Sequence, residues 1–399
     1  MTDHIKQHLI DPEICIRCYT CEATCPIEAI THDDNNVVVD AATCNFCMAC
    51  IPVCPTGSID AWRVVDTPYS LEDQFSWSEL PEQDEALASS GDGSNSLEAL
   101  DEAMAALLAD AHRGAGGRAR APASASKPSV NLYNLSNPVT ARIQGSYRLT
   151  EEGSDSEVRH IILDFGGKSF PVLEGQSIGI LPPGATREGK AHLPRLYSVS
   201  SPRDGERPNY NNVSLTVKRE EGGVCSNYLC DLKIGDEVRV TGPFGSTFLM
   251  PDDPQARLLM ICTGTGSAPF RAFTMRRQRV AGSGQGGDMT LFFGARTPDS
   301  LPYFGPLKKI PDGLLHKHLV FSRLPGQPKE YVQDRLLQEH DAVAEMLDDP
   351  HSYIYICGLR GMEEGVERAL TNIAESMGVE WTGLRDTMRD EGRYHVETY

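Results

Sequence analysis

The sequence predicts a multidomain α+β protein, in which a small cysteine-rich domain precedes an antiparallel β-barrel and an α/β unit with a parallel sheet. Three observations support this fold class. Eight of the twelve cysteines form two copies of one pattern near the N-terminus. Short segments with strand patterning, separated by Gly, Pro, Asn and Asp, fill the middle of the chain. Strand and helix patterns then alternate towards the C-terminus, and 399 residues are too many for one domain of usual size.

The cysteine pattern reads C-x2-C-x2-C-x3-C-P in both copies, and every cysteine recurs 29 positions later. The first copy comprises Cys15, Cys18, Cys21 and Cys25, and the second comprises Cys44, Cys47, Cys50 and Cys54. Three closely spaced thiolates can bind three irons of a [4Fe-4S] cube, and in two-cluster ferredoxins the fourth ligand comes from the other repeat. We therefore expect two clusters, with Cys54 completing the first set of three and Cys25 completing the second.

A structural zinc ribbon and a set of disulfides are the alternatives to two clusters. Zinc sites usually pair two C-x2-C hooks, whereas this chain has two runs of four cysteines. No signal peptide points to the oxidising compartments in which disulfides form. The stretch from residue 8 to residue 64 resembles the bacterial two-[4Fe-4S] ferredoxins.

The net charge of −19 is concentrated in the N-terminal part of the chain. Residues 1–70 carry ten acidic residues against three basic ones, a net charge of −7, and residues 71–112 carry eleven acidic residues and no Lys or Arg. Residues 113–399 have 35 acidic and 34 basic residues. Nucleic-acid binding is disfavoured, because it requires a basic stripe. The acidic part either maintains solubility or docks a basic redox partner.

The apolar stretches are too short to span a membrane. No charged leader precedes an apolar run, so we expect a cytoplasmic protein. A reducing cytosol would also keep the cysteines available as cluster ligands.

We expect domains at residues 1–70, 131–253 and 254–399, with an acidic, flexible linker at 71–130. Within the linker, Leu97, Leu100, Met104, Leu107 and Leu108 have helical spacing, and residues 113–127 have the Gly/Ala/Arg/Ser-rich composition of disorder. The predicted barrel strands are 158–165, 176–181, 196–200, 213–217 and 237–241. The predicted strands of the α/β unit are 257–262, 289–293, 318–321 and 352–357, and its helices are 270–281, 331–347 and 363–377.

The tetrapeptide Arg195-Leu196-Tyr197-Ser198 offers three groups that a flavin requires. A guanidinium pairs with the flavin phosphate, an aromatic ring covers the isoalloxazine, and a hydroxyl donates to its reactive nitrogen. The motif resembles the R-x-Y-S sequence of the ferredoxin–NADP reductase family, which implies that Arg195, Tyr197 and Ser198 fill these roles in that order.

Two further segments resemble phosphate-binding loops of the same family. The first, with Gly223, Val224, Cys225 and Ser226, precedes a helix whose N-terminus would face the flavin pyrophosphate. The second, Thr263-Gly264-Thr265-Gly266-Ser267-Ala268-Pro269, follows a predicted strand. Its glycines let the backbone approach the nucleotide, and the resemblance implies that Thr263, Gly264 and Gly266 bind NADPH.

The remaining motifs occur in the order expected for this family, over residues 138–399. The resemblance implies that Ser322, Arg323 and Tyr331 hold the 2′-phosphate and adenine of NADPH, because only a 2′-phosphate needs the arginine. It also implies that Cys357, Gly358 and Leu359 lie against the nicotinamide. At the chain end, Glu397 would join Ser198 and Cys357 in a catalytic hydrogen-bonding group, and Tyr399 would stack on FAD.

A ferredoxin part followed by a plant-type reductase resembles the reductase component of the benzoyl-CoA epoxidase systems, and residues 8–18 also resemble the start of those components. The resemblance implies FAD, two [4Fe-4S] clusters and NADPH as cofactors, and a separate di-iron oxygenase that binds benzoyl-CoA as the electron acceptor. One alternative is the same chemistry with another oxygenase or a ferredoxin pool as acceptor. The other is an electron-transfer subunit that does not itself turn over NADPH.

Overall fold

The computed structural model describes residues 5–45, 50, 51, 53, 54, 56, 58, 59, 63–65, 67–81, 119–185, 192–280 and 286–399. The chain divides into two compact units, Met1–Ser96 and Leu97–Tyr399. Among the described residues, no helix combines the length and the apolar character needed to cross a membrane. The helix predicted between Leu97 and Leu108 lies outside the described residues.

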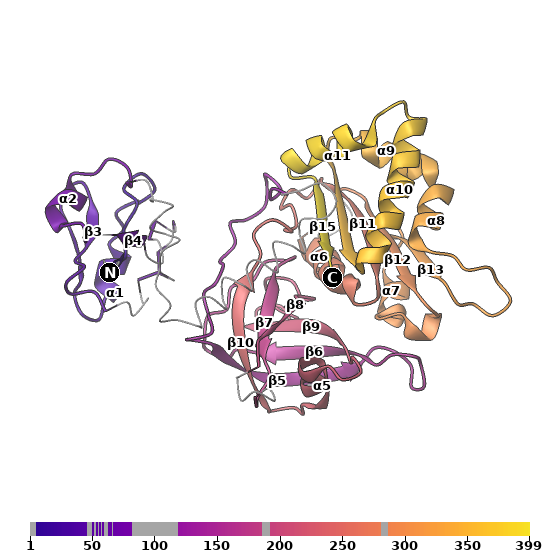
Figure 1. Cartoon of the computed structure of the whole chain (residues 1–399), viewed down its shortest axis with the longest axis horizontal. Coiled ribbons are helices and arrows are strands. Elements are labelled where there is room, and N and C mark those ends of the chain that lie inside the picture. Colours follow the sequence, from indigo (N-terminus) through magenta and orange to yellow (C-terminus); the bar gives the residue numbers. More distant parts are fainter. Residues whose placement is uncertain are drawn as a thin grey trace. The chain divides into compact units, whose positions relative to one another are not determined.

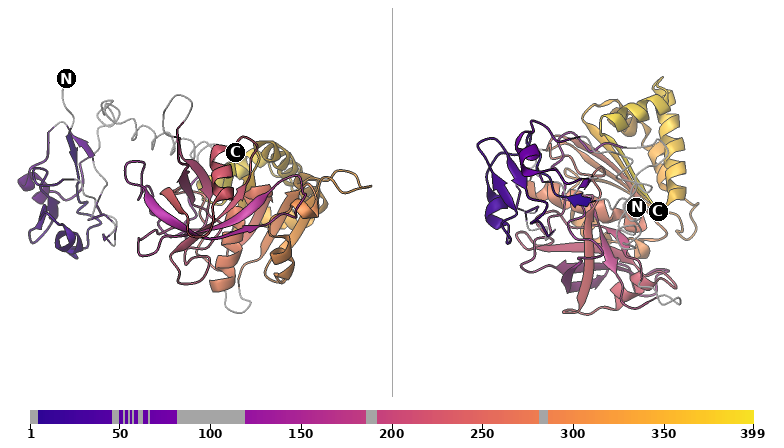
Figure 2. Two further views of the ribbon diagram at one scale, coloured as in Figure 1. Left: turned by 90° about the horizontal axis from the view of Figure 1, so that it is seen from below. Right: turned by 60° about the vertical axis from the view of Figure 1, so that its left-hand side comes forward.

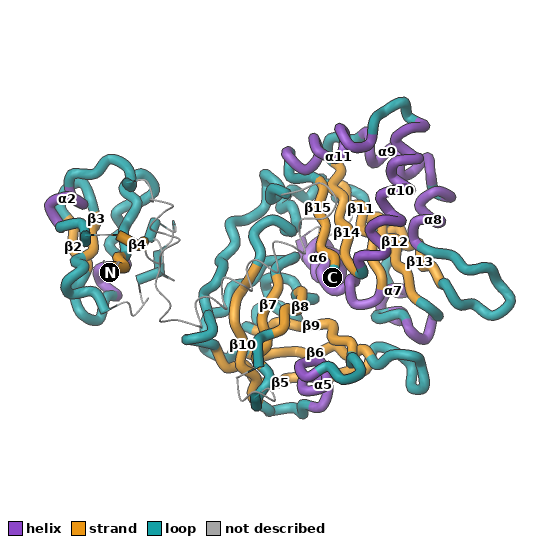
Figure 3. The backbone as a smooth tube through the Cα atoms, viewed as in Figure 1, coloured by secondary structure: helices purple, strands orange, loops and turns teal. Residues whose placement is uncertain are grey.

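The first unit contains two small antiparallel strand pairs. Figure 3 shows its short strands and helices separated by loops. β1 pairs with β4, and β2 pairs with β3. The elements are β1 (Ile5–Gln7), α1 (Thr20–Thr24), β2 (Ile30–His32), β3 (Val37–Val39), β4 (Arg63–Val65) and α2 (Leu71–Phe75). A bridge between Ile10 and Ile59 connects the segment before the first repeat to the segment after the second. Both residues belong to an apolar core that also contains cysteines of both repeats.

Helix α2 belongs to this first unit, although the sequence placed residues 71–130 in a linker. Ser70 caps the helix by accepting a hydrogen bond from the Asp73 backbone N–H. The buried Gln74 side chain exchanges two hydrogen bonds with the Val39 backbone, at 2.9 and 3.1 Å. The acidic composition of residues 71–130 indicated a linker. Composition could not reveal this pairing, because the strand edge that Gln74 contacts lies 35 residues earlier in the chain.

The second unit begins with the predicted antiparallel barrel, a six-stranded sheet in the order β8-β7-β10-β5-β6-β9 (Figure 1). Its strands are β5 (Val139–Arg148), β6 (Val158–Asp164), β7 (Ser177–Leu181), β8 (Arg195–Ser198), β9 (Asn212–Lys218) and β10 (Glu237–Phe244). A bridge from Val199 to Leu215 connects the two ends of this order. The sequence analysis missed β5, although Val139, Ala141 and Ile143 alternate inward as in a strand. Helix α5 (Val224–Asp231) follows β9.

The predicted α/β domain follows, with five parallel strands in the order β13-β12-β11-β14-β15. The strands are β11 (Arg257–Thr263), β12 (Met289–Ala295), β13 (His316–Phe321), β14 (Ser352–Gly358) and β15 (Tyr394–Thr398). The helical elements are η2 (Gly264–Gly266), α6 (Ser267–Val280), η3 (Pro298–Ser300), α7 (Phe304–Lys309), α8 (Val332–Gln338), α9 (His340–Asp348), α10 (Arg360–Ser376) and α11 (Trp381–Asp390). Figure 2 shows the barrel and this domain from two further directions.

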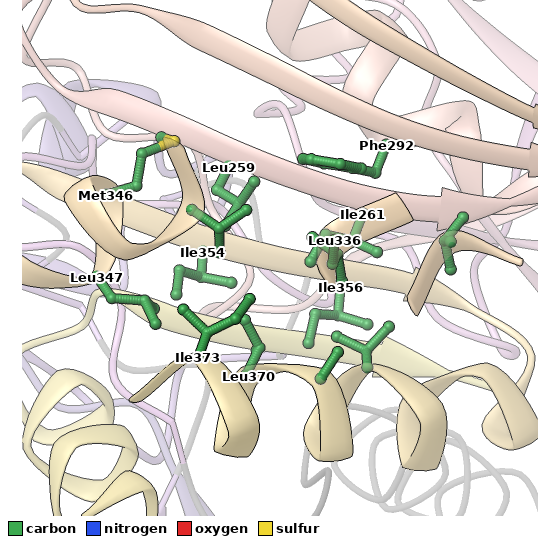
Figure 4. Packing of buried hydrophobic residues seen from close by; sticks show 14 of the residues in the cluster. Leu259, Ile261, Phe292, Leu336, Met346, Leu347, Ile354, Ile356, Leu370 and Ile373 are labelled. Atoms are coloured by element: carbon green, nitrogen blue, oxygen red, sulfur yellow. The ribbon is translucent and has the colours of Figure 1, made fainter. Parts of the chain in front are cut away.

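Helices cover both faces of the parallel sheet. Residues of α8, α9, α10 and α11 pack on one face, where Leu259, Ile354 and Leu370 are fully buried (Figure 4). Residues of α6 and α7 pack on the other face, together with Phe293 and Tyr355. These two cores give the layered arrangement that the alternation of strands and helices predicted.

Two details of the α/β domain differ from the sequence prediction. The helix predicted over residues 331–347 is two helices, because Glu339 leaves helical geometry with φ −93° and ψ 29°. Strand β15 was not predicted. Its five residues are all buried at the edge of the sheet, so they lack the polar alternation that marks an exposed strand.

A buried charged network joins the barrel to the α/β domain. Arg271 of α6 donates two hydrogen bonds, at 2.6 and 2.8 Å, to the carboxylate of Glu206 on the barrel side. The Tyr303 hydroxyl lies 2.6 Å from Thr216 Oγ1 and 3.0 Å from His160 Nδ1. Although burial opposes it, hydrogen bonds from His160 and Arg271 hold the pKa of Glu206 well below its usual value. The network fixes α6, and with it the loop that begins the helix.

Residues 119–131 form an ordered strap on the second unit, so the prediction of disorder over residues 113–127 is wrong for its described part. Ala119 is buried, and Arg203 donates a 2.7 Å hydrogen bond to Ser126 Oγ. The Gln176 side chain donates to the Ser129 carbonyl at 2.9 Å. Local composition indicated disorder. The prediction failed because the groups that hold the strap come from distant parts of the sequence.

The ion pair beside the strap provides a test of its contribution to stability. Arg203 contacts Glu174 at 2.8 Å, and the Glu174 side chain is 0% exposed. Arg203→Met would leave this buried carboxylate without its charged partner, so we expect the free energy of unfolding to fall by about 3–5 kcal/mol in urea denaturation. The control Arg142→Ala removes an exposed ion pair with Glu237, and we expect a loss of at most about 1 kcal/mol. Equal losses for the two variants would contradict the prediction.

Candidate functional site

Two adjoining cavities open between the barrel and the parallel sheet. The nucleotide cavity, of about 920 Å³, is lined by the ends of β11, β12 and β13 and by the start of α8. The flavin cavity, of about 710 Å³, is lined by β8, α5 and the chain end. The sheet order reverses between β11 and β14, and ligands of such sheets bind at the carboxyl ends of the strands at this switch point.

The glycine-rich turn after β11 is confirmed, since η2 covers Gly264–Gly266 and α6 begins at Ser267. Gly264 has a φ of +56°, which favours glycine. A Cβ atom at Gly266 would lie 2.2 Å from the Cys357 carbonyl oxygen, so only glycine fits there. The turn therefore packs directly against the end of β14.

The R-x-Y-S motif forms strand β8, which pairs with β7 at the mouth of the flavin cavity. Arg195 is exposed, and its guanidinium donates to the carbonyl groups of Pro194 and Leu193 at 3.3 and 3.5 Å. Burial raises the pKa of Tyr197 far above its usual value, and the Cys225 thiol raises it further. Tyr197 is therefore a neutral ring on the cavity wall.

Ser198, Cys357 and Glu397 come from three strands, β8, β14 and β15, that meet at this site. Ser198 Oγ donates a 2.5 Å hydrogen bond to Glu397 Oε1. The parallel pairing of β14 and β15 places Glu397 opposite Cys357. Burial raises the pKa of Cys357 well above its usual value, and the charge of Glu397 adds to this effect. Cys357 is thus a neutral thiol beside a serine–carboxylate pair.

Tyr399 extends beyond β15 and lines both cavities. Its backbone N–H donates to the Gly358 carbonyl at 3.1 Å, and its carbonyl accepts from the Arg360 N–H at 3.3 Å. The residue as a whole is 53% exposed, and its hydroxyl lies 2.8 Å from Thr265 Oγ1. Figure 1 shows the chain end beside α6.

Helix α5 carries the loop predicted to hold the flavin pyrophosphate. Gly223 is its N-cap, with extended backbone, and a Cβ atom there would lie 2.6 Å from Ser226 Oγ. Gly223, Val224, Cys225 and Ser226 all line the flavin cavity. Val224 is exposed, whereas burial raises the pKa of the Cys225 thiol to about 11. The backbone of this helix start therefore faces an open cavity.

The residues predicted to bind the 2′-phosphate line the far end of the nucleotide cavity, where Ser322, Arg323 and Tyr331 are found together. The sequence analysis missed Arg296, which lies in the same cavity wall. Asp155 contacts both Arg296 and Arg323, at 3.3 and 3.4 Å. Arg296 follows β12 as Arg323 follows β13, and this repeated position was the signal that could have identified it.

The part of the nucleotide cavity beside the end of β11 also suits a polar ligand. Thr263 Oγ1 is buried in the cavity wall and has no hydrogen-bond partner among the described residues. A buried hydroxyl without a partner is costly, and a bound ligand could satisfy it. Of the three residues predicted to lie against the nicotinamide, the exposed Leu359 lines the nucleotide cavity, whereas Cys357 is fully buried behind it.

The first cysteine set and Cys54 lie close enough to interact. Burial, together with the charges of Cys15 and Cys54, raises the pKa of Cys21 to about 11. Asp11 donates its backbone N–H to the Ser58 carbonyl at 2.7 Å, which ties the start of the first repeat to the segment that follows Cys54. This geometry agrees with Cys54 as the fourth ligand of the first set.

A second chain of contacts connects Cys25 to the other repeat. The Ala29 N–H donates to Cys25 Sγ at 3.3 Å, Asp40 donates to the Ala29 carbonyl at 2.8 Å, and Cys44 donates to the Asp40 carbonyl at 2.9 Å. No three His, Cys, Asp or Glu side chains among the described residues converge as on one metal ion. Cys47 lies outside the described residues, so the pairing of ligands stays a prediction.

Cys54 itself has the chemistry of a ligand. Although burial opposes it, hydrogen bonds from Ser58 and Thr56 lower its pKa to about 7, and the Ser58 hydroxyl lies 3.2 Å from the sulfur. The thiolate is the form that binds metal. A hydrogen bond from the Thr20 side chain likewise lowers the pKa of the exposed Cys18. These residues fit an iron–sulfur cluster.

Comparison with known proteins assigns each part of the chain to a family. Residues 7–55 match the 4Fe-4S dicluster domain, residues 172–248 match the oxidoreductase FAD-binding domain, and residues 260–368 match the oxidoreductase NAD-binding domain. The last two matches lie within the barrel and the α/β domain that enclose the cavities, and each covers part of its domain.

Relatives that match about two thirds of the chain are ferredoxin–NADP reductases. The cyanelle ferredoxin–NADP reductase of Cyanophora paradoxa is 40% identical over 287 residues, which cover 68% of this chain and 79% of the relative. The ferredoxin–NADP reductase of Thermosynechococcus vestitus is 40% identical over 292 residues, covering 68% and 75%. The solved ferredoxin–NADP+ reductase of Plasmodium falciparum matches with a TM-score of 0.55 at 27% identity, covering 68% of this chain and 99% of that structure.

An FAD-binding barrel joined to a nucleotide-binding α/β domain defines a flavin- and nicotinamide-dependent oxidoreductase. The chain belongs to the ferredoxin–NADP reductase family and carries a 4Fe-4S dicluster domain at its N-terminus. It is therefore an NADPH-dependent oxidoreductase.

The crossed ligand assignment can be tested one cysteine at a time. Cys54→Ser should damage the cluster held by Cys15, Cys18 and Cys21, because the fourth ligand comes from the other repeat. Cys25→Ser should damage the other cluster. Paramagnetic resonance spectra of the two reduced variants would distinguish the clusters, and the reverse pattern of losses would exclude the crossed assignment. The buried Cys230→Ser, outside both repeats, is the control and should leave both signals intact.

Proposed function

We propose that this chain takes electrons from NADPH through FAD and two [4Fe-4S] clusters and delivers them to a separate oxygenase component. The observation that carries the proposal is the presence, in one chain, of two adjoining cavities in FAD- and NAD-binding domains and of a 4Fe-4S dicluster domain. A reductase with its own cluster unit has an internal acceptor for single electrons. Its final acceptor is then another protein.

The proposed acceptor is a di-iron oxygenase that acts on benzoyl-CoA. This choice is supported by the order of the two parts and by the resemblance of residues 8–18 to the reductase components of such systems. The acidic N-terminal part, with a net charge of −7 over residues 1–70, favours an acceptor with a basic docking surface. Another oxygenase, or a pool of soluble ferredoxin, is the alternative acceptor.

The proposed domain limits follow the contacts described above. The cluster domain extends at least to residue 77, because α2 and Trp77 contact β3 and the preceding turn. The reductase part begins with the strap at residue 119 and divides near residue 254 into the barrel and the α/β domain. A chain starting at residue 119 is therefore the appropriate truncation for testing the reductase part.

The residues of the chain prepare the site for hydride transfer. FAD, when bound, accepts a hydride from NADPH and releases its electrons one at a time. Arg195 would hold its phosphate and Tyr197 would cover its ring. The Ser198–Glu397 pair would hold a proton at Ser198 Oγ, on the flavin side of the site. Cys357, kept neutral by burial and by Glu397, would place an uncharged surface against the nicotinamide.

Anaerobic titration with NADPH, with and without the candidate oxygenase, tests the proposal. We expect NADPH to bleach both the flavin and the cluster absorbance of the full chain, and the oxygenase with benzoyl-CoA and O₂ to restore it. Residues 119–399 alone should reduce ferricyanide but fail to support the oxygenase. Full oxygenase turnover with this truncated chain would show that the clusters are not on the route. Reoxidation by ferredoxin but not by the oxygenase would favour the alternative acceptor.

Arg323→Ala tests the proposed 2′-phosphate site. Loss of a charge-assisted contact costs about 1.5–3 kcal/mol, so the KM for NADPH should rise roughly 10- to 150-fold, and the KM for NADH should change little. Steady-state reduction of ferricyanide with each cofactor provides the comparison, and Arg142→Ala on the outer barrel is the control. Equal changes for NADPH and NADH would remove Arg323 from the phosphate site.

Tyr399→Ser tests the proposed position of the terminal ring. If the ring covers the flavin where nicotinamide must stack, its displacement consumes part of the binding energy, and NADH has less binding energy than NADPH. The variant should bind nicotinamide more tightly, use NADH better and release NADP+ more slowly. The NADPH-to-NADH ratio of kcat/KM is the measurement. An unchanged ratio would mean that the terminus is only a structural plug.

A further inference from the structure

Thr265 and Tyr399 form a hydrogen-bonded pair at the junction of the two cavities. Their hydroxyl oxygens are 2.8 Å apart. Of the described residues, only Lys218, Glu220, Thr265 and Tyr399 line both the nucleotide cavity and the flavin cavity. The sequence motif predicted that Thr263, Gly264 and Gly266 of this turn bind the nucleotide. It predicted no role for Thr265.

The backbone of Tyr399 is fixed on both sides. Its N–H donates to Gly358 and its carbonyl accepts from Arg360, so the chain end continues the ladder between β14 and β15. Only rotation of the side chain can move the ring away from the flavin cavity. Of the polar contacts described for the side chain, the one with Thr265 holds its outer end.

The partner side of the pair is also fixed. Thr265 lies between Gly264 and Gly266, and Gly266 packs so tightly against the Cys357 carbonyl that a Cβ atom would approach it to 2.2 Å. The following helix, α6, is held by the Arg271–Glu206 ion pair at 2.6 Å. The Thr265 hydroxyl is therefore a rigid anchor for a movable ring.

We propose that Thr265 is a positioning residue that latches the Tyr399 ring over the flavin cavity and thereby strengthens the preference for NADPH. A nucleotide that extends from Arg323 towards Tyr399 passes the turn of Thr265, because Arg323, Thr265 and Tyr399 all line one cavity. Displacement of the ring then requires this hydrogen bond to break. The inference deepens the proposed function, since it presupposes that Tyr399 covers the nicotinamide position.

Two single variants remove the hydrogen bond from opposite sides. Thr265→Val deletes the hydroxyl of the anchor and keeps its branched shape, and Tyr399→Phe deletes the hydroxyl of the ring and keeps the stacking surface. Thr265→Ser retains a hydroxyl and serves as the matched control. The double variant Thr265→Val/Tyr399→Phe measures whether the two hydroxyls act as one pair.

The first readout is binding, measured by calorimetry on the FAD-loaded full-length protein. A net hydrogen bond corresponds to roughly a 2- to 12-fold change in affinity. We expect each single variant to bind NADP+ about 2- to 12-fold more tightly, and the double variant to bind no more tightly than the singles. Adenosine 2′,5′-bisphosphate has no nicotinamide and should bind equally to all variants. Thr265→Ser should bind NADP+ like the unmodified protein.

The second readout is the NADPH-to-NADH ratio of kcat/KM, which should fall in Thr265→Val and Tyr399→Phe and remain unchanged in Thr265→Ser. Unchanged or weaker NADP+ binding in both single variants, or fully additive effects in the double variant, would overturn the latch. Tyr399→Ser distinguishes failure of the latch from failure of the proposed position of the Tyr399 ring. If it relaxes cofactor preference and the hydroxyl variants do not, the ring gates the site without a latch. If it too has no effect, the proposed position of Tyr399 is wrong.

Discussion

The parallel pairing of β15 with β14 is the contact on which the flavin–nicotinamide site depends. This pairing adds a fifth strand to the edge of the sheet and sets Glu397 opposite Cys357. It also carries the chain one residue further, so that Tyr399 reaches the turn of Thr265. Because the register of a strand determines which side chains face each neighbour, a shift of one residue would separate the serine, thiol and carboxylate groups.

A second constraint is the buried polar interface between the two domains of the reductase part. The flavin cavity belongs mainly to the barrel and the nucleotide cavity mainly to the α/β domain, so hydride transfer requires a fixed relation between them. Arg271 and Glu206 provide it with a bidentate ion pair close to the start of α6. Buried ion pairs contribute little net stability, but they enforce a particular geometry when every partner is satisfied.

The cluster unit is held together in a different way, because contacts join the segments at the ends of its two short repeats. The Ile10–Ile59 bridge and the Asp11–Ser58 hydrogen bond bring the start of one repeat to the end of the other. The crossed ligand assignment, which stays a prediction, requires this kind of proximity between Cys54 and the first cysteine set. A domain with so small an apolar core gains stability when a cluster joins its ligands.

Local patterns were sufficient to predict the three folded parts, most strands and the positions of the glycine turn, the R-x-Y-S strand and the cysteine repeats. Each of these depends on residues that are neighbours in sequence, such as Gly264 and Gly266 or Cys15 and Cys18. The sequence by itself also determined which chemical groups the site contains, because the motif of Arg195 to Ser198 and the chain end are recognisable without coordinates.

Only the tertiary structure decided where distant groups meet. The strap at residues 119–131 is ordered by Arg203 and Gln176, α2 by Val39, and the Arg323 region contains Arg296 and Asp155 because three loops converge. The contact between Thr265 and Tyr399 joins residues 134 positions apart. Such contacts depend on packing and strand register over the whole domain, and composition and periodicity report only on neighbours along the chain.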